Sequence, residues 1–146
     1  MKVLIQRVSK ASVSINNEQV GAIDQGLLLL IGIERTDTCD TLSKMAKKVL
    51  AYRVFSDSEG KMNLSVRDIQ GGVLAVSQFT LAAETNKGLR PGFSTAAPPA
   101  EAERLYLAFV DMLKQEHDCI ATGVFGADMQ VSLVNDGPVT FLLEMP

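Results

Sequence analysis

The sequence predicts an α+β fold, in which a strand-rich body of antiparallel or mixed sheet carries two main helices. Three observations support this prediction. The first third of the chain alternates apolar and polar residues, as strands do. Two later segments carry apolar side chains at helical spacing. The 146 residues contain no long linker or repeat, so we expect a single domain at residues 1–146.

Short polar turns join the predicted strands. The alternation from Val3 to Ile15 leads into a turn at residues 16–18, and a second turn at residues 24–26 precedes the apolar run Leu27–Ile33. This continuous run predicts a strand that is buried on both faces. Further strands are expected at residues 20–23, 71–81, 129–134 and 139–144.

The two helices are predicted from their apolar stripes. Residues at i, i+3, i+4, i+7 and i+8 from Leu42 form the first stripe, and several N-cap candidates precede it between residues 36 and 41. Pro98-Pro99 suits the first turn of the second helix. His117 follows the end of this second helix, where a capping role is more in keeping with its position than catalysis.

Composition limits the classes of function. The net charge is −3 and the sequence pI is about 5.1, so the chain is a poor candidate for coating a nucleic acid, and we expect no DNA partner. A local pocket could still hold one end of a nucleic acid. The start of the chain does not read as a signal peptide, and the longest apolar run is too short to span a membrane. We therefore expect a soluble, cytoplasmic protein without membrane contact.

The usual catalytic motifs are missing from the sequence. The chain has a single histidine, no phosphate-binding glycine loop, and no His, Cys, Asp or Glu grouping with metal-ligand spacing. We therefore expect neither a metal nor a cofactor. If the chain is an enzyme, its catalysis must depend on backbone amides, on positioning and on groups that the substrate supplies.

Two segments could form such a site. In Ser77–Thr80 (SQFT), polar residues follow a buried apolar strand without a glycine or proline, so their side chains and amides could line a pocket. The alternative is an edge strand with one face in water. In Asn135–Thr140 (NDGPVT), Gly137-Pro138 is either a hairpin turn with the usual trans bond or a rigid tip that meets a ligand.

Together the two motifs, SQFTL at 77–81 and NDGPVT at 135–140, closely resemble the D-aminoacyl-tRNA deacylase family. The N-terminal stretch and the loop Asn86–Phe93 (NKGLRPGF) are also similar to that family, so the resemblance covers essentially the whole chain. It implies hydrolysis of the ester between a D-amino acid, or mischarged glycine, and the 3′-terminal adenosine of tRNA. It also implies a cytosolic homodimer that rejects L-amino acids.

The resemblance further implies the roles of individual residues. The pair Gly137-Pro138 would be cis and would enter the pocket of the partner subunit, where its carbonyl groups exclude an L side chain. The pocket floor would be the catalytic set Ser77, Gln78, Phe79 and Thr80, with the amides of Phe79 and Thr80 facing the oxyanion. The adenosine would be held by three further residues: Arg7, Phe125 and Met129.

Two questions stay open at this point. The chemistry belongs either to Thr80 as a nucleophile or to the 2′-hydroxyl of the terminal adenosine, and the lack of a side-chain base favours the second. The alternative to a deacylase is a non-catalytic module that binds adenosine or an RNA 3′ end on the same dimeric fold. Weak contacts with the rest of the tRNA are expected at Lys87, at Arg90 or at the lysines of the first helix (Lys44, Lys47 and Lys48).

Overall fold

The computed structural model describes residues 1–146 and contains eight strands, two α-helices and one short 3₁₀ helix. In chain order the elements are β1 (Lys2–Ile15), β2 (Glu18–Ile23), β3 (Gly26–Gly32), α1 (Cys39–Ala51), β4 (Phe55–Ser56), β5 (Met62–Leu64), β6 (Gly72–Ser77), η1 (Phe79–Ala82), α2 (Pro99–Glu116), β7 (Ile120–Thr122) and β8 (Gln130–Glu144). This confirms the α+β class with two main helices.

Six strands form one mixed sheet. Its order is β2-β1-β3-β6-β7, and β8 pairs with β1. The strand β1 is antiparallel to β2, β3 and β8, whereas β3, β6 and β7 run parallel to one another. Parallel neighbours need a crossover, and α1 and α2 lie in the two crossovers. Three strands therefore end at the same edge of the sheet.

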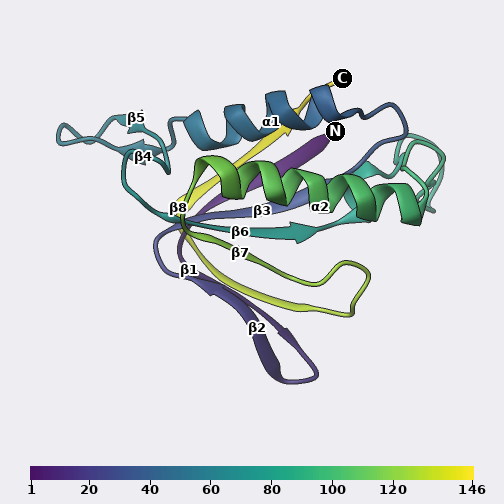
Figure 1. Cartoon of the computed structure of the whole chain (residues 1–146), viewed down its shortest axis with the longest axis horizontal. Coiled ribbons are helices and arrows are strands. Elements are labelled where there is room, and N and C mark those ends of the chain that lie inside the picture. The colour runs from purple at the N-terminus through teal and green to yellow at the C-terminus, as the bar shows by residue number, and fades with distance from the viewer.

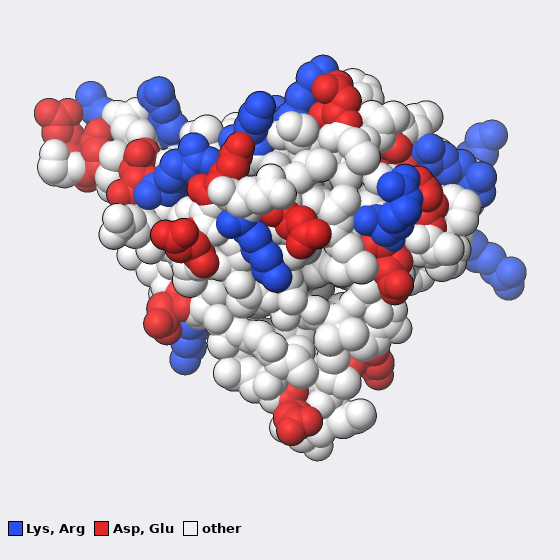
Figure 2. Space-filling view, viewed as in Figure 1, with Lys and Arg blue, Asp and Glu red and all other residues white.

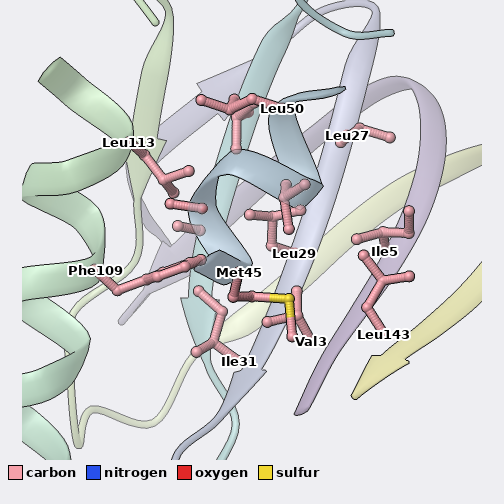
Figure 3. Packing of buried hydrophobic residues seen from close by; sticks show 14 of the residues in the cluster. Val3, Ile5, Leu27, Leu29, Ile31, Met45, Leu50, Phe109, Leu113 and Leu143 are labelled. Atoms are coloured by element: carbon pink, nitrogen blue, oxygen red, sulfur yellow. The ribbon is translucent and has the colours of Figure 1, made fainter. Parts of the chain in front are cut away.

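The helices cover one face of this sheet, and the hairpin of β1 and β2 extends away from them (Figure 1). Alternate residues of β3 belong to the hydrophobic clusters on the two faces of the sheet. Leu27, Leu29 and Ile31 face the helices, and Leu28 faces the other side. Figure 3 shows side chains from β1, β3, β8, α1 and α2 meeting between the helices and the sheet. The prediction that this strand is buried on both faces is confirmed.

Local sequence signals explain several element ends. Asn16 and Asn17 adopt positive φ angles of 50° and 65° between β1 and β2, a conformation that asparagine tolerates. Thr38 caps α1, because its side chain accepts a hydrogen bond from the Thr41 amide and its own amide donates to the Thr41 hydroxyl. His117 caps α2 through its amide, and its ring meets the Gly71 carbonyl.

The structure corrects two expectations and adds three strands. The two expected C-terminal strands are one strand, β8, with a bulge at residues 136–139, so Gly137-Pro138 is not the turn of a hairpin. The strand predicted to reach residue 81 ends at Ser77 and continues as 3₁₀ helix. The strands β4, β5 and β7 were not expected.

Neither α1 nor α2 has the length and apolar character of a membrane span.

Candidate active site

A pocket of about 750 Å³ opens where the three parallel strands end. The segments that follow β3, β6 and β7 all contribute to its lining, together with the first turn of α2. Ligands of sheets with parallel strands commonly bind beyond the carboxyl ends of those strands, and this volume is usual for a small-molecule site. The fold therefore forms a ligand-sized cavity at this edge.

The floor of the pocket comes from the end of β6. Ser77 pairs with Ile31 of β3, and the next amide, of Gln78, donates to the Ile31 carbonyl at 2.8 Å. The chain then turns into η1, whose first hydrogen bond runs from the Leu81 amide to the Gln78 carbonyl. The amides of Phe79 and Thr80 therefore precede the first bonded amide of the turn.

The segment after β7 forms the opposite wall. Phe125 and Met129 line the pocket there and are half-buried. The ring of Tyr106, from α2, lies 5.9 Å from the ring of Phe125. A Cβ at Gly123 would lie 2.6 Å from the Met129 sulfur, so glycine at this position allows Met129 to pack closely.

Tyr106 also connects α2 to the sheet beneath the pocket. Its hydroxyl donates a 2.8 Å hydrogen bond to the Ala75 carbonyl in the middle of β6. Burial raises the pKa of Tyr106 to about 12, because the phenolate would lose its hydration. The side chain is thus a neutral hydrogen-bond donor that supports the wall at Phe125.

Two aromatic rings stand at the mouth. Phe79 and Phe93 lie 5.3 Å apart between ring centroids, and they are 60% and 41% exposed. The charged residues in the lining are Arg35 and Asp128. Sequence reasoning assigned no role to Phe93, Arg35 or Tyr106. The only available signal was the length of the irregular loop that contains Phe93.

The bulge of β8 forms a second candidate feature, which we call the tip (residues 136–139). Two steps along β1, from Gln6 to Val8, match five steps along β8, so the extra residues project from the ladder. The bond between Gly137 and Pro138 is cis, and the φ angle of Gly137 is +139°. Asn135 spans the base of the tip, because its side chain accepts from the Val139 amide and donates to the Thr140 hydroxyl.

Arg7 fixes the tip to the body of the protein. Its Nε donates to the Asp136 carbonyl at 2.9 Å, and its Nη1 donates to the Val54 carbonyl at 2.7 Å. A Cβ at Gly137 would lie 3.1 Å from Arg7 Nη2 and 2.7 Å from a methyl group of Val139. The guanidinium thus bridges the bulge and the segment that follows α1.

The predicted site residues therefore fall into two groups within one chain. The first lines the pocket and comprises Ser77, Gln78, Phe79, Phe125 and Met129. The second lies at the tip and comprises Arg7, Gly137 and Pro138, none of which lines that pocket.

Thr80 is exposed beside the floor of the pocket and accepts a hydrogen bond from the Gln78 amide group. No three His, Cys, Asp or Glu side chains lie together as a metal site would require.

A family model described as D-Tyr-tRNA(Tyr) deacylase matches residues 4–144. The chain belongs to this deacylase family. A D-aminoacyl-tRNA deacylase of Saccharophagus degradans is 69% identical over 99% of this chain and 100% of its own length. The assignment confirms the expected family and the expected enzyme class, a hydrolase that edits aminoacyl-tRNA.

Two solved structures share the fold of this deacylase family member. A c-Myc DNA unwinding element binding protein is 45% identical, with a TM-score of 0.97, and the match covers 100% of this chain and 99% of the other. A structure described as a probable eukaryotic D-amino acid tRNA deacylase has a TM-score of 0.82 over 97% of both chains. At 16% identity, the second match shows the fold alone.

Proposed function

We propose that this protein hydrolyses the ester between a D-amino acid, or glycine, and the 3′-terminal adenosine of tRNA, and that it rejects L-amino acids. The observation that carries the proposal is a pocket lined by Ser77, Gln78 and Phe79, in a chain of the deacylase family. Its apolar and aromatic lining suits one nucleoside with its amino acid. Such a site needs no basic groove, which agrees with the net charge of −3.

The amides at the start of η1 are suited to stabilise the reaction's oxyanion. When water adds to the ester carbonyl carbon, negative charge develops on the carbonyl oxygen before the ribose oxygen leaves with a proton. The amides of Phe79 and Thr80 precede the first hydrogen-bonded turn, so they are free to donate to that oxygen. Loss of one such donor typically costs about 2.7–4 kcal/mol of transition-state stabilisation.

The proton transfer is assigned to the 2′-hydroxyl of the substrate rather than to Thr80. The only side-chain hydrogen-bond partner of Thr80 is the Gln78 amide group, which has no basicity to activate a nucleophile. We therefore expect Thr80→Ala to keep most of the activity. An aminoacyl-tRNA with a 2′-deoxy terminal adenosine should resist hydrolysis. Complete inactivity of a folded Thr80→Ala variant would instead support a threonine nucleophile.

Rejection of L-amino acids is assigned to the tip of a second copy of the chain. The tip does not line the pocket of its own chain, so it needs a partner to reach one. One edge of β8 is unpaired, and Leu133, Val134, Phe141 and Leu142 on both sides of the tip are 36% to 47% exposed. A long apolar edge strand favours association, which supports a homodimer. Arg7, which is hydrogen-bonded to the tip, would enter the adenosine site of the partner together with the tip.

A heterodimer of two variants tests this arrangement. One chain carries Ala97→Phe, which fills the pocket, and the other carries Gly137→Ala, which distorts the tip. The only open pocket then belongs to the chain with the altered tip. If the tip acts on the partner's pocket, the purified heterodimer hydrolyses D-tyrosyl-tRNA and spares L-tyrosyl-tRNA. Loss of discrimination in the heterodimer would show that each tip serves its own pocket.

The activity itself is tested with D-tyrosyl-, L-tyrosyl- and glycyl-tRNA. Release of D-tyrosine and glycine without release of L-tyrosine is the expected result. Binding of all three without release would favour the non-catalytic module that holds an adenosine or an RNA 3′ end. The Ala97→Phe variant serves as the control, because it blocks the pocket.

A further inference from the structure

The starting observation is the position of Arg35 at the mouth of the pocket. Arg35 follows β3, and its amide donates to the Thr95 carbonyl at 3.1 Å. The neighbouring Glu34 forms a bridge with Ala96. The backbone on both sides of the mouth is therefore paired, so Arg35 is held next to the segment that carries Phe93.

Only one of the three guanidinium nitrogens of Arg35 has a hydrogen-bond partner in the chain. Its Nε donates a 2.6 Å hydrogen bond to the Ser94 carbonyl, whereas its two terminal nitrogens have no partner in the chain. By contrast, Arg67 and Arg104 each use Nη2 in an ion pair with a glutamate. Arg35 is also the only lysine or arginine in the lining of the pocket. Two charged donors of a pocket-lining residue thus have no protein acceptor.

We infer that Arg35 binds the phosphodiester on the 5′ side of the substrate's terminal nucleotide. The inference rests on the proposed function. The rest of the tRNA is joined to the 5′ side of the terminal nucleoside, so a nucleoside held at Phe125 and Met129 must have that side toward the mouth of the pocket. A guanidinium fork matches two phosphate oxygens and carries a fixed positive charge. Figure 2 shows further Lys and Arg side chains protruding at the end of the molecule where the segment between η1 and α2 lies in Figure 1.

The test compares three substrates that differ only on the 5′ side of the terminal nucleoside. They are D-tyrosyl-tRNA, D-tyrosyl-adenosine 5′-phosphate and D-tyrosyl-adenosine. With Arg35→Gln, we expect kcat/KM to fall about tenfold to hundredfold for the two phosphorylated substrates, mostly through KM, as for a lost charged hydrogen bond. The value for D-tyrosyl-adenosine should not change. Arg35→Lys should recover part of the loss.

Salt dependence gives a second readout. Loss of one phosphate contact should reduce the slope of log KM against log salt for D-tyrosyl-tRNA by about 0.7, the value for a single strand. The matched control is Arg67→Gln, which removes an exposed arginine paired with Glu116. Glu116 is at the other end of α2, roughly 21 Å along the helix from Ala102 in the lining of the pocket. This control should leave all three substrates and the slope unchanged.

Three outcomes separate the possibilities. An equal loss for all three substrates would overturn the inference, because Arg35 would then act only by holding the Ser94 segment. Unchanged kinetics for Arg35→Gln would overturn it as well. If wild-type protein hydrolyses none of the three D-amino acid esters, the proposed function fails first, and the inference fails with it.

Discussion

Replacing Arg7 with methionine separates the stability of the tip from the chemistry of the pocket. The change keeps much of the side chain's apolar stem and removes two hydrogen bonds, to the Val54 carbonyl at 2.7 Å and to the Asp136 carbonyl at 2.9 Å. A hydrogen bond to a charged donor contributes about 1.5–3 kcal/mol. The bond to Val54 is partly buried and counts in that range, whereas the bond to Asp136 is exposed and contributes less.

We therefore expect Arg7→Met to lower the free energy of unfolding by about 2–3 kcal/mol, as measured by urea denaturation. The tip would then lose its attachment to the segment after α1. If the tip excludes L-amino acids, the ratio of D- to L-tyrosyl-tRNA hydrolysis should fall about tenfold. This fall corresponds to a loss of about 1.4 kcal/mol in the free-energy difference between the D and L reactions.

The control for this prediction is Arg67→Met, which removes one exposed ion pair and should cost at most about 1 kcal/mol. Its ratio of D- to L-tyrosyl-tRNA hydrolysis should equal that of wild type. A stable Arg7→Met variant with undiminished discrimination would refute the reasoning. Loss of D-tyrosyl-tRNA binding with intact discrimination would instead assign Arg7 to the adenosine.

Three further predictions concern the tip, the free edge and the support of the pocket. Gly137→Ala should lower the free energy of unfolding by about 1–3 kcal/mol and impair the rejection of L-amino acids, because the φ angle is +139° and the new methyl group meets Val139. The control for the discrimination between enantiomers is Gly60→Ala, at a φ angle of +78° with open space around it. Leu142→Glu on β8 should shift sedimentation toward the monomer, whereas Leu107→Glu, at a similarly exposed position on α2, should not. Tyr106→Phe should remove an alkaline loss of stability. The Tyr106 pKa is about 12 in the folded state against 10 unfolded, so the wild type is stabilised below pH 10 and loses about 2–3 kcal/mol between pH 10 and 12, measured by urea titration at each pH.

Local patterns predicted the elements whose formation depends on neighbours in sequence. The apolar stripe of α1, the asparagines between β1 and β2, and the apolar run of β3 each specify one conformation from a few residues. The strand β7 escaped prediction because it has three residues and exists through pairing with β6, which lies more than forty residues earlier. The bulge of β8 escaped for the same reason, since its register is set by β1.

The site shows the same division between local and distant information. Ser77, Gln78 and Phe79 were found because polar residues directly follow a buried strand, and the structure places them in the pocket. Arg35 and Tyr106 gave no local signal. Arg35 joins the mouth through pairing with residues 95 and 96, and Tyr106 looks like any core position of an amphipathic helix until its hydroxyl meets the Ala75 carbonyl.

The separation of pocket and tip within one chain has a mechanistic consequence. The pocket lies at the carboxyl ends of β3, β6 and β7, whereas the tip projects from β8 and is fastened to the segment after α1. Two side chains, Arg7 and Asn135, hold the tip at its base, and neither belongs to the pocket. If the tip rejects L-amino acids as proposed, substitutions at the tip should change which enantiomer is hydrolysed, and substitutions at the floor should change how fast. This separation lets selectivity be tested independently of catalysis.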